Sequence, residues 1–269
     1  MSARRVTTER VTGALKRRAR VARRRVRRGF RGAVENPDRP LSLDMGHESR
    51  TLLIAFGGMR GELGIPPFEF FKATAGFLIK RLFVRDLSQA WYHRGVPGCG
   101  PTIDETADAL KRLIAEHDVE RLVVAGTSAG GYGALVFGTL LGAETAICFA
   151  PQTVLDLDVL AGIEDHRWDR QVEELMADGG LDPRWTDLRP ALARARHTDT
   201  RYELHFDPSF PPDRRHCERL DGLDGVVLRP REKGGHNIAR DMRDAGELEP
   251  LLRTVLLGAP QGQASARPG

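Results

Sequence analysis

The sequence predicts an α/β protein with a mostly parallel central sheet and helices on both faces. Two observations predict this class: strand candidates that are short and mainly apolar recur along the chain, and helical patterns lie between them. A chain of 269 residues is also long enough to bury a large core. The expected strands are 41–45, 51–56, 81–85, 121–125, 145–149, 202–206 and 226–229.

The clearest helical pattern covers 103–117, where apolar residues at intervals of four, three and four positions share one face. Thr102 and Glu105 have the spacing of a capping box, which satisfies backbone amides at the start of a helix. A helix of this kind connects two parallel strands and covers one face of the sheet.

The chain divides into three parts, the second of which contains an insertion. Residues 1–40 form a basic amphipathic tail and a linker, because the stretch ends in prolines that break the helical pattern. Residues 41–258 form the α/β domain, and within it 154–200 are expected to be a helical cap insertion, since the stretch is too long for an ordinary connection. Residues 259–269 are rich in Gly, Pro, Gln and Ala and are expected to be disordered.

The basic charge is concentrated in the tail. Residues 1–32 hold 13 Lys and Arg and one acidic residue, a balance of +12, so the remainder carries −8 of the total of +4. As a helix, the tail would present one apolar stripe from Val11 to Phe30 among arginines. This pattern is typical of a segment on an anionic membrane surface and also of a solvated arm. One hypothesis is therefore peripheral contact of residues 1–32 with the inner membrane surface.

Several classes of protein are not supported by the sequence. No run of eighteen apolar residues occurs, so we expect a soluble, cytoplasmic chain. The odd number of cysteines, Cys99, Cys148 and Cys217, without a CxxC pair, favours free thiols. No metal-ligand spacing or phosphate-binding motif appears, and the acidic body has no basic stripe for nucleic acid, so we expect no metal, no cofactor and no specific nucleic acid.

The strongest signal is the segment Gly126-Thr-Ser128-Ala-Gly130, which follows an apolar strand and precedes a helix of small residues. A GxSxG turn is so sharp that its glycines must allow the strand and the helix to approach closely. The turn lifts the serine hydroxyl above the sheet at a helix N-terminus, which favours a nucleophilic role for Ser128 over a merely structural glycine turn.

With this strand, turn and helix order, residues 41–258 resemble the α/β-hydrolase superfamily. The resemblance implies a nucleophilic serine, then an acid after a later strand, then a histidine after the last strand. Two aspartates fit the acid: Asp207 directly follows the strand at 202–206, and Asp213 lies six residues on, just before a helical run. We favour Asp207 for its position at the strand end and keep Asp213 as the alternative.

The base and the oxyanion donors follow from the same resemblance. His236 is the only histidine in the loop after the last expected strand, whereas His205 is expected inside a strand and His216 on a helix surface. One oxyanion donor is then the backbone amide of Ala129. The second is the amide of Gly58 or Met59, in the glycine-rich turn after the strand at 51–56.

A further group lies after the strand at 81–85. Arg85, Asp86, Trp91 and Tyr92 reach the edge of the sheet where ligands gather, so they are candidates for binding substrate or bracing the oxyanion turn. The alternative is purely structural, an ion pair beside an aromatic core anchor. In this group the sequence also resembles hydrolase-like proteins associated with bacterial surface glycans.

The expected function is that of a serine hydrolase that cleaves an ester through a Ser-His-Asp triad and an acyl-enzyme. The substrate would be a small-molecule or glycan ester. One alternative is acyl or acetyl transfer to a glycan, or its removal from one. The other is a catalytically silent hydrolase-like protein that binds a partner with the same fold.

Overall fold

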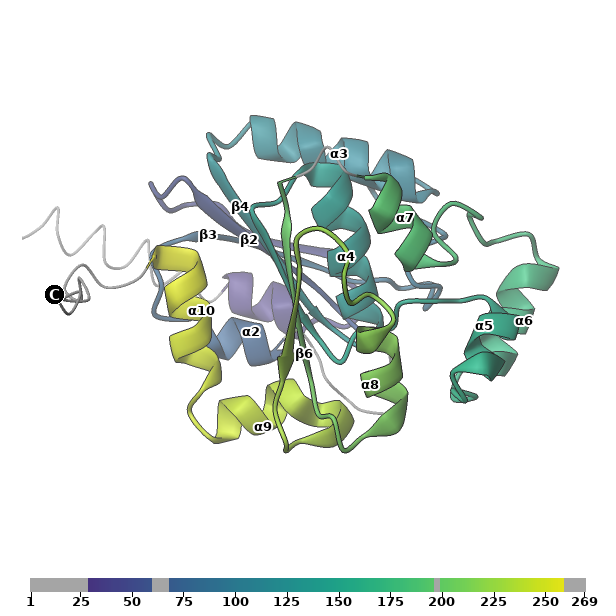
Figure 1. Ribbon diagram of the computed structural model, residues 1–269. Helices are drawn as coiled ribbons and strands as arrows, with labels where there is room; N and C mark the ends of the chain where they lie inside the picture. Colours follow the sequence, from purple (N-terminus) through teal and green to yellow (C-terminus); the bar gives the residue numbers. More distant parts are fainter. Residues whose placement is uncertain (1–28, 60–67, 196–198, 259–269) are drawn as a thin grey trace, which may run out of the picture.

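The computed structural model describes residues 29–59, 68–195 and 199–258, and it contains one sheet of seven strands (Figure 1). The expectations for residues 1–28 and 259–269 lie outside this described part. The strands are β1 (Leu41–Asp44), β2 (Thr51–Phe56), β3 (Lys80–Val84), β4 (Arg121–Thr127), β5 (Thr145–Phe149), β6 (Arg201–Phe206) and β7 (Val226–Pro230). All seven expected strands are present, with ends that differ by at most two residues.

The strand order is β1-β3-β2-β4-β5-β6-β7, and every neighbouring pair is parallel except β1 with β3. The predicted class, a mostly parallel sheet, is therefore confirmed. The chain moves from β2 outward to β3 in one direction and from β4 outward to β5 in the other. The carboxyl ends of β2 and β4 thus flank the point where the order reverses, the place where open α/β sheets bind ligands.

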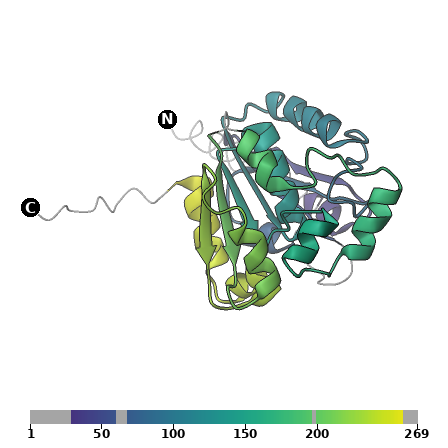
Figure 2. The same ribbon diagram turned by 45° about the vertical axis from the view of Figure 1, so that its right-hand side comes forward.

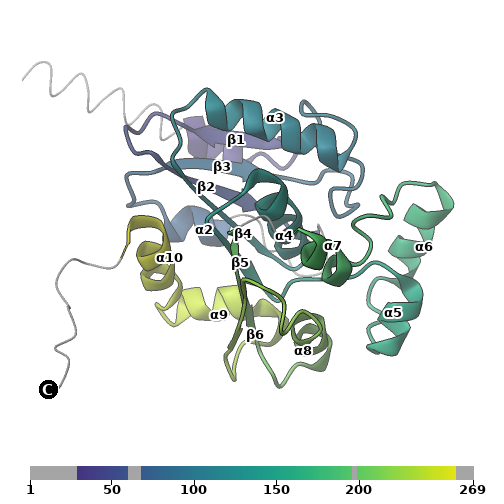
Figure 3. The ribbon, with the colours of Figure 1, turned by 45° about the horizontal axis from the view of Figure 1, so that its top comes forward.

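Helices cover both faces of the sheet because side chains alternate between the two faces of each strand. Leu52 and Ile54 pack in one buried cluster with α3 (Ile103–Ala115) and α4 (Ala129–Leu141), and Leu53 packs in the other. The second face is covered by α2 (Phe68–Ala73), α9 (Ile238–Asp244) and α10 (Leu248–Leu257). Figures 2 and 3 show these two helical layers from two further sides; in Figure 3, α3 and α4 lie apart from α2, α9 and α10.

The expected helix at 103–117 is confirmed as α3, two residues shorter than its pattern. Its cap forms as the sequence predicts: the Glu105 amide donates to the Thr102 hydroxyl oxygen at 3.2 Å. α4 differs in character, because it is apolar on nearly all sides and buried along eleven of its residues. A helix that is apolar all round belongs in the centre of a fold, and α4 packs against β4 and β5.

The stretch 154–200 contains three helices, α5 (Leu157–Gly162), α6 (Asp169–Ala177) and α7 (Leu188–Arg194). α7 packs beside α4, whereas α5 and α6 stand out at one side of the molecule in Figures 1 and 3. The loop between α5 and α6 packs on the loop after β3, where Trp168 meets Trp91 edge to face with ring centroids 5.8 Å apart.

The end of the basic tail belongs to the core. Phe30 is 4% exposed and packs against Phe71 and Phe83, and Val34 is fully buried. The expected boundary at residue 41 is therefore too late, because two apolar side chains of the preceding segment fill the second core cluster. Phe30 also cannot face a membrane as the stripe predicts, since its ring is already packed.

Candidate active site

The turn between β4 and α4 has the geometry of a nucleophile elbow. Ser128 has φ 56° and ψ −121°, a conformation that costs a non-glycine residue energy and clusters at functional sites. Its flanking glycines are required by close backbone contacts: a Cβ on Gly126 would lie 1.9 Å from the Gly130 carbonyl oxygen, and one on Gly130 would lie 2.3 Å from that of Phe56. The local sequence therefore strains the serine backbone and holds it there.

Ser128 is 9% exposed and sits directly at the start of α4. Its amide donates to the Phe149 carbonyl at 2.9 Å, which ties the turn to the end of β5. Within the described ranges, no residue forms a hydrogen bond with the Ser128 hydroxyl. The hydroxyl is thus presented at the helix N-terminus, where unpaired backbone amides favour negative charge.

His236 lies in η1 (Gly235–Asn237), a short 3-10 turn between β7 and α9, and is 8% exposed. Gly234 and Gly235 before it both have positive φ, which glycine adopts without strain. Its Nδ1 lies 2.7 Å from one carboxylate oxygen of Asp213 and 2.9 Å from the other. This pairing orients the ring and makes Nε2 the nitrogen that is free to exchange a proton.

The structure corrects the preference for Asp207 as the partner of His236. Asp213, the alternative acid, occupies the first turn of α8 (Pro211–Glu218) and is 1% exposed. Sequence position alone favours Asp207 because it directly follows β6, but the next residues turn the chain into α8 and bring Asp213 to the histidine.

Asp207 instead holds the two loops of this region together. It accepts hydrogen bonds from the Ser209 amide and hydroxyl, at 2.8 and 2.6 Å, and from the Gly235 amide at 2.8 Å. Burial works to raise the pKa of Asp207, but these hydrogen bonds outweigh it and leave the pKa below the usual value. Its role is to fix the backbone beside His236.

The turn after β2 lies beside the elbow. In the parallel register Phe56 faces Gly126, so the next residues, Gly57 and Gly58, run alongside Thr127 and Ser128. A Cβ on Gly58 would lie 3.1 Å from the Thr127 carbonyl oxygen, so only glycine allows this approach without a shift. Met59 packs partly buried against the main core cluster. The three candidate oxyanion donors, Ala129, Gly58 and Met59, therefore belong to two adjacent turns at one edge of the sheet.

Tyr92 holds the turn after β2 in place through a hydrogen bond. Its hydroxyl donates to the Gly57 carbonyl at 2.7 Å, while the Gly57 amide donates to the Val84 carbonyl at 2.8 Å. Both backbone groups of Gly57 are thereby held. Tyr92 is 1% exposed. Its contacts support the expected role in bracing the turn and give no support to a role in binding substrate.

The other three candidates in this group also have structural partners. Asp86 is buried and accepts from the amides of Ala90 and Tyr92 at 2.6 and 2.9 Å. Trp91 is fully buried and its indole donates to Gln152 at 2.5 Å. Arg85 donates to the Asn36 carbonyl at 2.8 Å and so anchors the segment before β1. These contacts favour the structural alternative, with Trp91 and Tyr92 as the aromatic core anchor, and a role of the four residues in substrate binding stays a prediction.

One charged residue near the site escaped the sequence analysis. Arg167, in the loop between α5 and α6, donates to Asp213 at 3.0 Å, and its Nη1 lies 3.3 Å from His236 Nδ1. Next to it His216 is fully buried and not on a helix surface as expected, because its Nε2 is 2.9 Å from the Asp165 carboxylate. In the sequence Arg167 is one of several charged residues around Trp168, within the insertion that is expected to be a helical cap, and no motif sets it apart.

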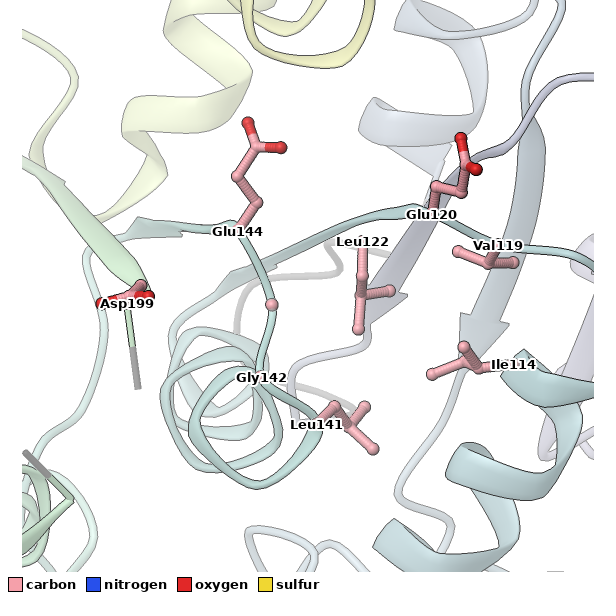
Figure 4. A pocket seen from close by; sticks show the side chains of 9 residues that line it. Ile114, Val119, Glu120, Leu122, Leu141, Gly142, Glu144 and Asp199 are labelled. Atoms are coloured by element: carbon pink, nitrogen blue, oxygen red, sulfur yellow. The ribbon is translucent and has the colours of Figure 1, made fainter. Parts of the chain in front are cut away.

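A cavity of about 550 Å³ lies at the opposite edge of the sheet (Figure 4). Its lining includes Leu122 at the start of β4 and Glu144 just before β5, whereas Ser128 follows the end of β4. This cavity is therefore remote from the elbow, and Glu144 in its wall is already paired with Arg121 at 2.6 Å. We assign it no part in the chemistry of the site.

Two other kinds of feature are absent from residues 29–59, 68–195 and 199–258. No group of three or more His, Cys, Asp or Glu side chains is placed to hold a metal ion. No helix of this part is both long and apolar enough to cross a membrane. The cysteines Cys99, Cys148 and Cys217 are free.

The sheet order, the elbow after β4 and the histidine after β7 define the α/β-hydrolase fold. No protein-family model and no curated protein matches the chain, but solved structures do. The capsule O-acetyltransferase of Neisseria meningitidis serogroup A, in complex with caged gadolinium, matches with TM-score 0.59 and 14% identity over 79% of this chain and 90% of its own.

Two further solved structures are similar. Carboxylesterase CesB (YbfK) from Bacillus subtilis matches with TM-score 0.51 and 13% identity over 82% of this chain and 88% of its own. MGS-MChE2, an α/β hydrolase enzyme from a lagoon-sediment metagenome, matches with TM-score 0.50 and 16% identity over 81% of this chain and 95% of its own. The α/β-hydrolase fold expected from the sequence is thus confirmed.

Proposed function

We propose that this protein is a serine hydrolase that cleaves carboxylic esters, with Ser128 as nucleophile, His236 as general base and Asp213 as the acid that orients it. The observation that carries the proposal is the strained backbone of Ser128 in a GxSxG elbow together with the 2.7 Å His236–Asp213 pair that follows it in the chain. A structural glycine turn would need neither the strain on a serine nor a buried histidine–carboxylate pair.

In this mechanism the Ser128 hydroxyl gives its proton to His236 Nε2 as its oxygen bonds to the ester carbonyl carbon. Asp213 stabilises the resulting imidazolium through Nδ1. The Ala129 amide, with that of Gly58 or Met59, stabilises the negative charge on the carbonyl oxygen. The imidazolium then gives its proton to the leaving alcohol as the carbon–oxygen bond breaks, and an acyl group remains on Ser128.

Water completes the cycle by the same route. His236 takes a proton from water as the water oxygen bonds to the acyl carbon, and returns it to the Ser128 oxygen as the acid is released. The Ser128–His236 hydrogen bond belongs to the substrate complex, since such bonds are often long before substrate is bound. Asp213 and Arg167 already hold the ring on its other side.

A second candidate reaction is acyl transfer, in which a sugar hydroxyl takes the place of water. Its support is the similarity to the capsule O-acetyltransferase, whose TM-score of 0.59 is higher than that of either hydrolase compared above. The same Ser128, His236 and Asp213 would serve both reactions, because only the acceptor of the acyl group differs. A glycan ester or a glycan acceptor is therefore part of the proposal.

The proposal is tested by labelling the purified protein with a fluorophosphonate and measuring turnover of p-nitrophenyl acetate. We expect labelling at Ser128 and ester turnover, and we expect Ser128→Ala to abolish both, because the elbow serine is the nucleophile. The control is Ser88→Ala, a serine in the loop after β3. If the wild-type protein is neither labelled nor active, the catalytically silent alternative is supported instead.

A further inference from the structure

Arg167 connects the insertion between β5 and β6 to the proposed catalytic pair. It comes from the loop between α5 and α6, whereas Asp213 comes from α8 and His236 from η1. Its Nη1 donates to Asp213 Oδ1 at 3.0 Å, and His236 Nδ1 lies 2.9 Å from that same oxygen. Two donors from different parts of the chain therefore converge on one carboxylate oxygen.

A buried carboxylate holds Arg167 from the opposite side. Asp165 accepts from Arg167 Nε at 2.8 Å and from its Nη2 at 2.7 Å, a two-pronged pair that only arginine can make. His216 Nε2 lies 2.9 Å from the same Asp165, and the Thr153 amide donates to His216 Nδ1 at 3.2 Å. His216 is therefore neutral and donates from Nε2, because its Nδ1 is an acceptor.

Asp165 and Arg167 are both stabilised in their charged forms. Burial works to raise the pKa of Asp165, but hydrogen bonds from Arg167 and His216 outweigh it, so the pKa lies well below its ordinary value. Burial likewise opposes the charge of Arg167, yet the hydrogen bond with Asp165 and the attraction of Asp213 raise its pKa. The guanidinium thus stays charged beside His236.

The position of this charge matters for the base. His236 Nδ1 lies 2.7 Å from Asp213 Oδ2 and 3.3 Å from Arg167 Nη1, so a carboxylate and a guanidinium both meet the ring at this nitrogen. Asp207 contacts this loop through the Gly235 amide, and Asp165 holds Arg167 and His216 on the side away from His236. Phe210 covers the guanidinium, with its ring centre 5.6 Å from Cζ.

We infer that Arg167 is a positioning residue through which the α5–α6 loop holds Asp213 toward His236 and places a fixed positive charge beside the imidazole. The inference rests on the proposed function, since it concerns the base of that reaction. It makes the insertion part of the catalytic apparatus, although none of its helices contributes a member of the triad.

The test is the pH dependence of fluorophosphonate labelling, measured as a second-order rate between pH 5 and 9. In the wild type the rate should rise with pH as His236 loses its proton. Arg167→Met should move this rise to higher pH by about one unit, because a positive charge beside the imidazole is gone. It should also lower the plateau roughly tenfold, because Asp213 loses its anchor.

Two further variants separate charge from packing. Arg167→Lys keeps the charge but cannot form the two-pronged pair. The labelling rate at the high-pH plateau should therefore fall, while the midpoint of the rise with pH should stay near that of the wild type. Asp165→Asn removes a negative charge behind Arg167, so its midpoint should move to lower pH, opposite to Arg167→Met. Arg170→Met, an exposed arginine of α6 paired with Glu174, is the matched control and should change neither.

The outcomes are distinguishable. A wild type that is not labelled at any pH refutes the proposed function itself. A labelled wild type whose midpoint and plateau are unchanged in Arg167→Met overturns the inference about Arg167. The melting temperature shows whether Arg167→Met folds. If it does not fold, the midpoint of the pH dependence in Asp165→Asn tests the inference instead. A midpoint that is unchanged or raised overturns it.

Discussion

Asp207 and Asp213 lie six residues apart and are 3% and 1% exposed, yet they have different partners. Asp207 accepts from Ser209 and Gly235 and so fixes the backbone between β6, α8 and η1. Asp213 pairs with the ring of His236. Asp207 therefore shapes the loops, whereas Asp213 faces the proposed base. Their positions in the sequence do not distinguish these two roles.

At this scale we expect Asp213→Asn to lower ester turnover by about 10²-fold or more, because the amide neither selects the correct imidazole tautomer nor stabilises the imidazolium. Asp207→Asn should lower it far less and reduce the melting temperature instead, since the amide keeps only part of the hydrogen bonding. The measurements are kcat on p-nitrophenyl acetate and thermal unfolding. The opposite pattern of activities would restore Asp207 as the catalytic acid.

At the scale of elements, a buried histidine joins the loop after β3 to α4 and to the insertion. His93 Nδ1 accepts from the Asp182 amide at 2.9 Å, so its proton is on Nε2, 2.7 Å from the Tyr132 hydroxyl oxygen. That hydroxyl in turn donates to the Trp185 carbonyl at 2.6 Å. These contacts hold the segment between α6 and α7 against α4, and they require His93 to be neutral.

This requirement predicts a dependence of stability on pH. Burial lowers the pKa of His93 to about 4, despite the attraction of Asp182, whereas the unfolded chain has the ordinary value of 6.5. Between these values the unfolded state binds more protons, so the contribution of His93 is complete above pH 6.5 and falls by up to about 3 kcal/mol by pH 4.

The measurement is the free energy of unfolding in urea between pH 4 and 7 for the wild type and for His93→Gln. The advantage of the wild type over the variant should shrink as the pH falls, because glutamine does not titrate. His166→Gln, an exposed histidine that pairs with Asp169, is the control and should leave the slope unchanged. Parallel curves for the wild type and His93→Gln would contradict this account of the histidine.

At the scale of the whole molecule, the basic tail and the domain meet at the helical residues before β1. Phe30 and Val34 fill the core face that α2, α9 and α10 cover, and the Arg81 guanidinium lies over the Phe30 ring at 5.0 Å. Arg85 binds the carbonyls of Asn36 and Arg39 at 2.8 and 3.0 Å. The domain thus uses residues from about 30 onward, and membrane contact remains a proposal for the residues before them.

A chain that begins at Gly29 should therefore keep the melting temperature and the ester turnover of the full chain. It should lose co-sedimentation with anionic vesicles, which we expect of the full chain at low salt because arginines dominate residues 1–28. A full chain that ignores such vesicles at low salt would contradict the membrane proposal. The control, a chain that begins at Leu41, should lose about 3 to 5 kcal/mol of stability, since Phe30 and Val34 leave a cavity.

The strands and the elbow could be predicted because their signals are local. Short apolar runs such as Thr51–Phe56 and Thr145–Phe149 favour buried strands, and both strands have the bounds that the sequence predicts. The spacing of Gly126, Ser128 and Gly130 requires a close approach of strand and helix whatever surrounds it. The position of His236 after the last strand follows from chain order, because parallel strands present their carboxyl ends at one edge.

The fold class, the elbow and the histidine loop can therefore be predicted from the chain alone, since each depends on residues near one another in sequence. Three features depend on the folded chain: which aspartate faces His236, the contact of Tyr92 with the turn after β2, and the approach of Arg167 to the site from an insertion. The reason is physical: these contacts join segments 23 to 69 residues apart, and the direction in which a buried charge points depends on every loop that packs around it.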